Sequence, residues 1–436
     1  MMTALYTAIS GLNANGVSLS VIGDNVANMN TVGFKASRVA FGDVLSQLIT
    51  GIAGSSQIGR GVMVTEVAPL FTQGSFETTS SALDLAIDGN GFFIVQKNGA
   101  RFYTRAGQFS IDRDGYIVTP DGLVLQGYQV DSSGNITGSI GDLQIATQQI
   151  PANMTTQVEV AMNLDPTVTG HDPATFTLDG DGDGIADDPV NYDFTTQVTV
   201  YDSQGDAHAV TLYFIKDINN PNQWVVHYVY DDPANPGQLL DAGTQTLVFG
   251  TNGELVNDNS ATTTVNFNWG GGVLAPQSIV FNYGTGTGES PPGTGLDQST
   301  QFAGEFAVLK LSQDGYPAGS LKNLNISEDG TILGIFTNGQ TRTIGRVALA
   351  KFAAPTELVK MGRNLYAESY ASGQPIIGAA STGGLGRVLS NTLELSNVDL
   401  AEEFVKMITA QRGFQANSKI ITTTDSLLQE LVNLKR

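Results

Sequence analysis

The fold is decided first by residues 1–30, MMTALYTAISGLNANGVSLSVIGDNVANMN, which predict one amphipathic helix. Apolar residues recur in it every seven positions, as in a coiled-coil heptad. The repeating residues are Leu5, Leu12, Leu19 and Val26, with Ile9 and Gly16 between them. Asn28, Asn30 and Gly33 then interrupt the pattern, and Asn and Gly are typical of helix ends. A helix with such a stripe needs a partner to cover it.

A second helical pattern occupies residues 396–436. One early row holds Val398 and Val405, and the other holds Ala401 and Ile408. After Gly413 the phase slips, which alters supercoiling without ending a helix. The later rows contain Ile420, Leu427 and Leu434, with Thr424 and Leu431 between them. The matching stripes predict that the two terminal helices pair, the alternative being two separate helices that pack on the middle of the chain.

Between the helices the sequence is typical of strands and turns. Residues 83–87 alternate apolar with small or polar side chains, residues 91–95 are an apolar run, and Asn98-Gly99 then indicates a hairpin turn. Further Asp-Gly and Asn-Gly turns begin at Asp114, Asp121, Asn252, Asp314, Asp329 and Asn338. The predicted fold class is mainly β, in antiparallel barrel or sandwich domains, with N- and C-terminal α-helices paired as a coiled-coil-like inner domain.

Glycine content and charge predict four regions. The terminal helices, 1–30 plus 393–436, form a helical domain, and 31–75 plus 363–392 form a glycine-rich linker region. Residues 76–145 plus 299–362 form a discontinuous β-rich body domain. Residues 146–298 form an acidic, β-rich inserted domain, which ends in a Gly- and Pro-rich stretch at 284–298 where no regular structure is expected.

The net charge of −21 is concentrated in the middle of the chain. From Asp165 to Asp258 there are 16 acidic residues and one basic residue, Lys216. Nucleic-acid binding needs Lys and Arg clusters, so the composition excludes it. The chain has no Cys, which excludes disulfides. We expect no membrane insertion, because no apolar run approaches about 18 residues, and no cleaved signal peptide, because no basic residue precedes Lys35.

Residues 21–35, VIGDNVANMNTVGFK, resemble the N-terminal signature of the flagellar rod and hook protein family. The matching residues are Asn25, Asn28, Asn30, Thr31, Gly33, Phe34 and Lys35. The chain departs from the usual pattern at Asp24 and Met29. Residues 86–93 and 103–109 resemble the β domain of the same family, and residues 396–436 resemble its C-terminal helix, whereas 146–298 has no such resemblance.

The resemblance implies a structural protein and not an enzyme. Within the family, the inserted acidic domain favours the hook proteins over the alternative, a distal rod protein with an insertion. The implied polymer is a curved, hollow tube outside the cell that transmits torque as a universal joint, with the apolar rows of the terminal helices as its interface. The implied partners are further copies of the chain, rod, hook cap and hook-filament junction proteins, and the type III export apparatus.

No catalytic motif is present in the sequence. The histidines, His171, His208 and His227, lie in no HExxH pattern and beside no obvious nucleophile, and no Gly-Lys phosphate loop occurs. We therefore expect ordinary structural histidines and no catalytic residue.

One acidic segment, residues 179–188, has the spacing of a calcium loop. Its positions 1, 3, 5 and 9 are Asp179, Asp181, Asp183 and Asp187. Gly184 fits position 6, but position 12 is Val190 instead of Glu, which leaves Asp188 as a stand-in. The segment predicts a structural calcium site and no other cofactor, with a solvated acidic turn as the alternative. A calcium-stabilised, β-rich secreted adhesin is the competing function, and the heptad stripes argue against it.

Overall fold

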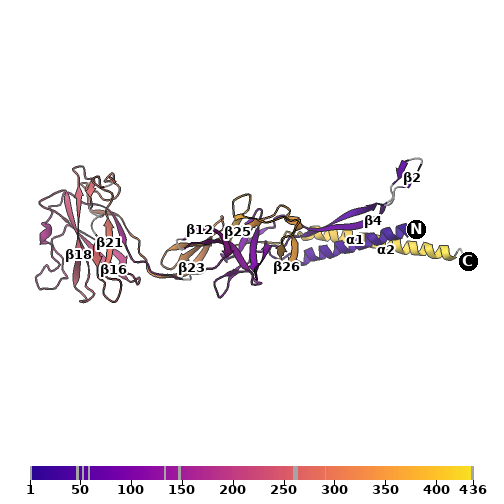
Figure 1. The fold of residues 1–436 in the computed structure, drawn as a ribbon, viewed down its shortest axis with the longest axis horizontal. Helices are drawn as coiled ribbons and strands as arrows, with labels where there is room; N and C mark the ends of the chain where they lie inside the picture. The colour runs from indigo at the N-terminus through magenta and orange to yellow at the C-terminus, as the bar shows by residue number, and fades with distance from the viewer. Residues whose placement is uncertain are drawn as a thin grey trace. The chain divides into compact units, whose positions relative to one another are not determined.

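The computed structural model describes residues 2–45, 49–51, 54–56, 59–131, 134–145, 149–258, 264–289 and 291–433 (Figure 1). The chain forms two compact units. The first unit contains Met1–Thr147, Lys322–Ile335 and Thr341–Arg436, and the second contains Gln148–Leu321 and Phe336–Gln340. Each unit is described by itself below.

Two long helices form one part of the first unit. Helix α1 spans Met2–Ala27 and helix α2 spans Leu400–Asn433, and the two lie side by side (Figure 1). The Asp399 carboxylate accepts hydrogen bonds from the backbone N–H groups of Ala401 and Glu402, which satisfies free donors at the start of α2. Within the described residues, no helix is long and apolar enough to cross a membrane.

The region expected to be a linker at 31–75 contains a long antiparallel hairpin. Strand β1 (Ser37–Leu45) pairs with β4 (Gly59–Pro69) through a register with two irregularities. The hairpin packs along α1, where Val62 N–H donates to the Ser10 hydroxyl at 3.2 Å. The linker prediction missed this hairpin because its glycines lie within strands as well as between them. Strands β2 (Ile49–Gly51) and β3 (Gly54–Ser56) form a short pair.

A mostly antiparallel sheet forms the body of the first unit. Part of its order is β24 (Thr331–Phe336), β25 (Thr341–Lys351), β11 (Val124–Val130), β7 (Phe92–Lys97), β8 (Ala100–Thr104), β27 (Leu365–Ala367) and β26 (Val359–Gly362). Shorter strands of the unit are β5 (Phe76–Thr78), β6 (Leu85–Asp88), β9 (Ser110–Ile111), β10 (Ile117–Val118), β12 (Ile136–Asp142), β28 (Ile376–Ala379), β29 (Arg387–Ser390) and β30 (Thr392–Glu394). Because β27, β28 and β29 all pair with strands of the body, the second linker, 363–392, is also part of the sheets.

The second unit is a β-sandwich. Its first sheet contains β15 (Phe194–Tyr201), β16 (Ala207–Lys216), β17 (Gln223–Asp231), β18 (Leu239–Phe249) and β19 (Leu255–Asn257). Its other sheet contains β20 (Val265–Phe267), β21 (Gln277–Asn282), β14 (Gln157–Asn163) and β22 (Ala307–Gln313), with β14 and β21 parallel. Trp224, Phe214 and Tyr283 are buried between the sheets. The sequence placed the end of this domain at 298, but the unit continues to Leu321 because β22 pairs with β14.

The Gly- and Pro-rich stretch at 284–298 has no strand among its described residues, but it is anchored. Leu255 N–H donates to the Gly295 carbonyl at 2.8 Å, and Thr287 N–H donates to the Leu255 carbonyl at 3.1 Å. A Cβ at Gly286 would lie 2.2 Å from the Val256 carbonyl oxygen, so only glycine permits this approach. The stretch is therefore packed against β19.

The charge of the chain lies almost entirely in the second unit. That unit contains two lysines and 21 acidic residues, a net charge of −19, which leaves −2 for the first unit. Both lysines are engaged, since Lys216 donates to the carbonyls of Pro166 and Val168 and Lys310 pairs with Glu159. The predicted fold class is confirmed: mainly antiparallel β domains with paired terminal helices.

Candidate functional site

The helix pair is held by small and polar residues. Gly11 of α1 lies against Asn417 of α2, Asn15 lies against Gly413, and the Asn25 amide donates to the Glu403 carboxylate at 3.2 Å. Each step forward along α1 thus matches a step back along α2, as in an antiparallel coiled coil. The buried positions are Ala8, Ala14, Ile22 and Asn25 on α1, and Glu403, Ala410 and Thr424 on α2.

The predicted apolar rows do not form this seam. The first row of α1 is half-buried: Leu5, Leu12, Leu19 and Val26. Leu12 and Val26 each follow a seam residue, Gly11 or Asn25, and Ile9 is exposed. On α2, Val405, Ile408, Ile420 and Leu427 are exposed, with Val405 at 64%. Val398 is half-buried ahead of α2, while the side chain of Leu431 and the whole of Leu434 lie outside the described residues. The two helices pair as predicted, but these rows do not form the seam between them, and their role as the interface between copies stays a prediction.

The motif residues after α1 join the helix pair to the hairpin. Ser37 and Asn25 exchange two hydrogen bonds, Ser37 N–H to the Asn25 side-chain oxygen at 2.8 Å and the Asn25 amide to the Ser37 carbonyl at 2.9 Å. Asn28 and Thr31 close the turn at the end of α1, and Asn30 is exposed. The motif therefore fixes where the chain leaves the helix.

Gly33 occupies a position that no other residue fits. Its φ is +68°, and a Cβ there would lie 2.5 Å from the backbone nitrogen of Ala106. Gly33 N–H donates to the Glu394 carbonyl at 2.7 Å, and the next residue, Phe34, is buried. Two of the motifs, 21–35 and 103–109, thus touch through backbone contacts at this glycine.

A buried ion cluster lies beneath the motif. The Lys35 ammonium donates to Glu394 at 2.6 Å and to the Thr72 carbonyl at 2.7 Å, and the Arg105 guanidinium lies 3.4 Å from the other Glu394 oxygen. Burial lowers the pKa of Lys35 and of Arg105, and in both cases the Glu394 carboxylate opposes that shift. Glu394 is fully buried, and its single negative charge neutralises the two buried positive charges only in part.

Sequence reasoning missed the C-terminal half of this junction. Glu394 precedes the helical pattern and carries no motif signal of its own. Asn397 was assigned to the polar flank of the helix, but its side chain accepts from Ala36 N–H at 2.8 Å and donates to the Leu70 carbonyl at 2.8 Å. Both residues lie hundreds of positions from their partners, so only the folded chain brings them together.

A groove lies between the helix pair and the β1–β4 hairpin, and is called here the hairpin groove. One section, with a volume of about 350 Å³, is lined by Ile22, Val39, Phe41, Val405 and Ala410, among others. The adjoining section, about 580 Å³, shares Asn15 and Phe41 with the first and adds Thr7, Gly11, Ala14, Gly59, Gly61, Val62 and Asn417. Its walls are mostly small or apolar side chains.

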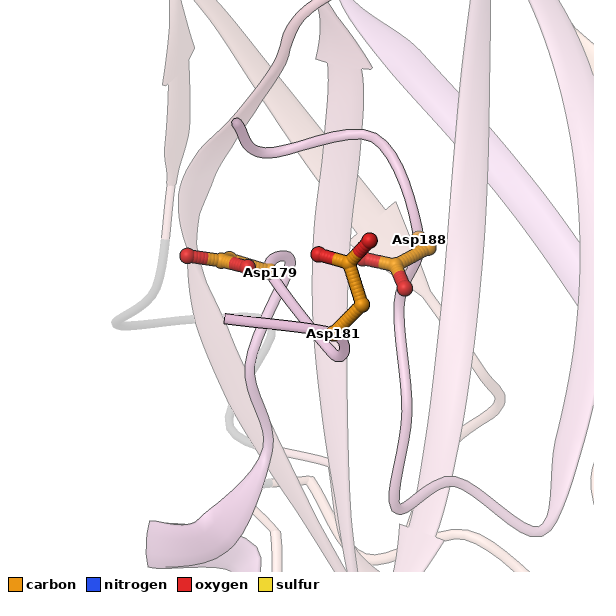
Figure 2. Close-up of side chains that lie close together, drawn as sticks. All are labelled: Asp179, Asp181 and Asp188. Carbon is orange, nitrogen blue, oxygen red and sulfur yellow. The ribbon is translucent and has the colours of Figure 1, made fainter. Parts of the chain in front are cut away.

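The acidic loop of the second unit brings three carboxylates together. One oxygen from each of Asp179, Asp181 and Asp188 lies within 4.8 Å of the others, and Figure 2 shows these side chains on two facing segments of the loop. Asp183 and Asp187, which the sequence placed in the ligand set, are not in this group. Lost hydration and the neighbouring carboxylates, Asp183 first, raise the pKa of Asp187.

Backbone N–H groups of the acidic loop also donate hydrogen bonds to two of these carboxylates. Asp179 accepts from Gly182 N–H at 2.7 Å and from Gly184 N–H at 3.0 Å, and Asp188 accepts from Gly180 N–H at 2.6 Å. Each carboxylate oxygen has a second lone pair, so these bonds leave room for a hard cation. The geometry fits calcium and also fits an acidic turn stabilised by its own backbone.

Each histidine of the chain lies beside an aspartate in the second unit. His208 lies 3.0 Å from Asp202 and stacks on Trp269, His227 lies 2.7 Å from Asp241, and His171 lies 3.8 Å from Asp193. Within the described residues, no third metal-binding side chain joins any of these pairs to form a candidate metal site. They are ordinary structural pairs.

Four family models match the chain. Residues 5–35 match "Flagella basal body rod protein", and residues 86–165 match "Flagellar hook protein FlgE/F/G D1 domain". Residues 163–316 match "Flagellar basal body protein FlaE D2 domain", and residues 389–434 match "Flagellar basal body rod FlgEFG protein C-terminal". The first and last matches coincide with the helix pair and its junction, and the FlaE D2 match falls within the acidic second unit.

Relatives that match over their full length are named flagellar hook protein FlgE. The flagellar hook protein FlgE of Borreliella burgdorferi is 37% identical over 459 residues and covers all of both chains. Those of Escherichia coli K12 and Treponema pallidum are each 34% identical, with 99% and 100% of this chain covered and 100% of each relative. The crystal structure of Helicobacter pylori flagellar hook protein FlgE2 has a TM-score of 0.52 at 17% identity, over 73% of this chain and 100% of that one, which supports the fold.

These matches decide between the alternatives that the sequence left open. The relatives are named hook proteins over their whole length, so neither a distal rod protein with an insertion nor an adhesin is favoured. The chain belongs to the flagellar hook protein family, FlgE.

Proposed function

We propose that this chain polymerises through its terminal helix pair into a curved, hollow tube, which acts as a universal joint and transmits torque from rod to filament. As a hook-family protein, the chain is a structural subunit of the extracellular hook and basal body assembly and not an enzyme. The observation that carries the proposal is the exposure of large apolar side chains on both terminal helices.

The exposed residues are Tyr6, Ile9 and Val17 on α1, and Phe404, Val405, Ile408, Ile420 and Leu427 on α2. Such side chains gain about 25 cal/mol for each Å² of apolar surface that leaves water. Their gathering on one helix pair is typical of a surface that another protein covers. Because the seam inside the pair uses Ala, Gly and Asn, the larger apolar residues remain available for neighbouring copies.

A helical tube needs contacts that propagate. A heterologous interface joins one surface to a different surface of the next copy and so does not close on itself. The helix pair has exposed apolar side chains and an adjoining hairpin groove, which share Val405 and together offer more than one kind of surface on one unit. This arrangement supports an open polymer better than a symmetric dimer.

The same helix pair is our candidate contact for the rod. The family models for residues 5–35 and 389–434 are those of basal body rod proteins, which indicates that rod subunits carry a similar pair. Contact with the hook cap, the hook-filament junction proteins and the type III export apparatus belongs to the same proposal. Each of these partners would meet the terminal segments or the ends of the polymer.

The test is a pair of substitutions on α2, Val405→Asp with Ile408→Asp. We expect loss of tubes in electron microscopy and of fast-sedimenting material, because buried carboxylates without partners are costly. The matched control is Ile218→Asp, which alters an apolar side chain of similar exposure, 52%, in the second unit. Normal tubes from the double variant would contradict the proposal.

Calcium binding is a second candidate, limited to the acidic loop. The observation that favours it is the approach of Asp179, Asp181 and Asp188. A bound calcium ion would neutralise part of the negative charge of the loop and fix its conformation. We propose a structural role for the ion within the second unit and none in polymer contacts.

A further inference from the structure

The two terminal helices end at different heights, which leaves one helix end without cover. Since Gly11 lies against Asn417 and each step along α1 matches a step back along α2, the first residue of α1, Met2, lies level with about residue 426. Residues 427–433 of α2 therefore extend past the start of α1, by about 10 Å at 1.5 Å per residue (Figure 1). We call this segment the free end of α2.

The free end carries both apolar and acidic side chains. Leu427 is 46% exposed and Leu428 is half-buried, while Asp425 at its base and Glu430 within it are exposed. The C-terminal end of a helix also carries partial negative charge from its free carbonyl groups. A surface with an apolar channel and a positive charge near Asp425 therefore complements the described part of this end.

The hairpin groove has both properties. Its section beside Asn417 is lined by Gly11, Ala14, Gly59 and Gly61 among others, and at Gly59 no heavy atom lies within 4 Å of the point that a Cβ would occupy. Phe41, nearly half exposed, forms an apolar wall there. Arg38 lines the groove and is exposed, and within the described residues it makes no ion pair.

We propose that the free end of α2 of one copy lies in the hairpin groove of the next copy. The contact rests on the proposed function, since it supplies a propagating link for the polymer. Leu427 and Leu428 contact Phe41 and Val62 of the neighbour, and Asp425 faces its Arg38. A second copy is the occupant because the chain carries both complementary surfaces and belongs to a hook family.

The test uses engineered cysteines in the full-length chain. The natural sequence has no Cys, so any disulfide comes from the introduced residues. Phe41→Cys with Leu427→Cys, oxidised in assembled hooks, is expected to give a ladder of covalent multimers. One copy cannot close this bond on itself, because Leu427 lies ten residues, about 15 Å along α2, from Asn417 at the groove.

Matched variants make the result specific. Each single cysteine variant is expected to remain monomeric, and the control pair Tyr370→Cys with Leu427→Cys, which uses a fully exposed side chain outside the groove, is expected to give no ladder. A second pair, Val62→Cys with Leu428→Cys, reports on the same contact if the first variant does not assemble. Dimers without higher multimers would overturn the propagating contact.

Assembly and contact fail in distinguishable ways. Tubes that form normally but give no ladder with either pair would overturn this contact and leave the proposed function standing. Failure of the unmodified chain to polymerise under any condition would instead overturn the proposed function.

A charge exchange tests the polar part of the contact. Arg38→Glu is expected to lower the yield of sedimenting polymer at low salt. Adding Asp425→Lys to the same chain is expected to restore it. Absence of restoration, together with an unaffected ladder, would remove the charge pairing from the contact.

Discussion

Gly11 of α1 lies directly against the side-chain amide of Asn417 of α2, and a Cβ at position 11 would come within 2.7 Å of that nitrogen. The relationship is repeated in reverse one turn further along, where a Cβ at Gly413 would lie 3.1 Å from the side-chain amide of Asn15. Each helix thus places a glycine against an asparagine of the partner helix. The exchange brings the two helix axes close together and fixes their register without large apolar side chains.

This exchange predicts opposite effects for two glycines of the same helix. Gly11→Leu should separate the helices and reduce polymer formation, since its side chain has no space beside Asn417. Gly16→Ala is the matched control, because no heavy atom lies within 4 Å of the point that a Cβ would occupy there, and Ala favours a helix by about 1 kcal/mol over Gly. Circular dichroism and sedimentation should show loss for the first variant and retained or increased helicity for the second. Equal behaviour would contradict the close seam.

The buried ion cluster predicts a large cost for a small change. Glu394→Gln keeps the shape but leaves Lys35 and Arg105 buried without a counter-charge, which should destabilise the first unit by about 3–5 kcal/mol. The control is Asp88→Asn, which removes a partly exposed partner of Arg387 and should cost less than about 1 kcal/mol. Thermal unfolding and hydrogen exchange of the first unit measure both.

The same variant should have a distinct pH dependence. Burial lowers the pKa of Lys35 in the folded chain, so the folded state binds fewer protons than the unfolded state between that lowered value and 10.5. Stability linked to Lys35 therefore rises as the pH rises through that window. Because the neutral amide of the Glu394→Gln variant no longer opposes the shift, the deficit of the variant should shrink toward alkaline pH. A deficit independent of pH would contradict this account.

The acidic loop predicts which carboxylates matter for calcium. Asp181→Asn with Asp188→Asn should abolish any rise in thermal stability of the second unit on addition of calcium, as ligand linkage requires. Asp183→Asn with Asp187→Asn should retain most of the rise, since neither residue is in the close group. Calorimetric titration of the full chain against a chelator-treated sample measures the response. Its absence in the unmodified chain would leave only the acidic turn.

The second unit can be removed at a defined point. Strand β13 (Gln149–Ile150) pairs antiparallel with the start of β23 (Gly319–Ile326), and Ile150 lies opposite Gly319. Replacing residues 151–318 with Asn-Gly should close a tight hairpin there. We expect the shortened chain to form tubes with altered curvature, seen by electron microscopy. Loss of tubes with the first unit still folded would show that the second unit is essential to the polymer.

The sequence predicted the helices well and their seam poorly, for a physical reason. Heptad analysis follows large apolar residues, and these led to Leu5, Leu12 and Leu19. The real seam uses Ala8, Gly11 and Asn15, whose value is small size or hydrogen bonding. A monomer sequence in a polymer must also satisfy contacts with other copies, and its most apolar rows need not face its own partner helix.

Contacts between residues far apart in the chain could not be predicted from the sequence either. Lys35 belonged to a recognised motif, but its carboxylate, Glu394, comes 359 positions later and has no signal that pairs the two. The calcium-loop spacing predicted only part of the carboxylate group, because it counts positions along the chain and takes no account of how the loop folds. The antiparallel bridge between Thr177 and Val190 brings the two ends of the segment together, and Asp188 replaces Asp187 beside Asp179.

The charge of the second unit affects how the hook meets its surroundings. With 21 acidic side chains and both lysines engaged, each copy gathers a cloud of mobile counterions. Crowding many copies into a lattice concentrates those ions and raises their osmotic pressure between neighbouring units. That pressure needs no fixed bond between residues. It resists compression wherever two such surfaces approach, and added salt weakens it.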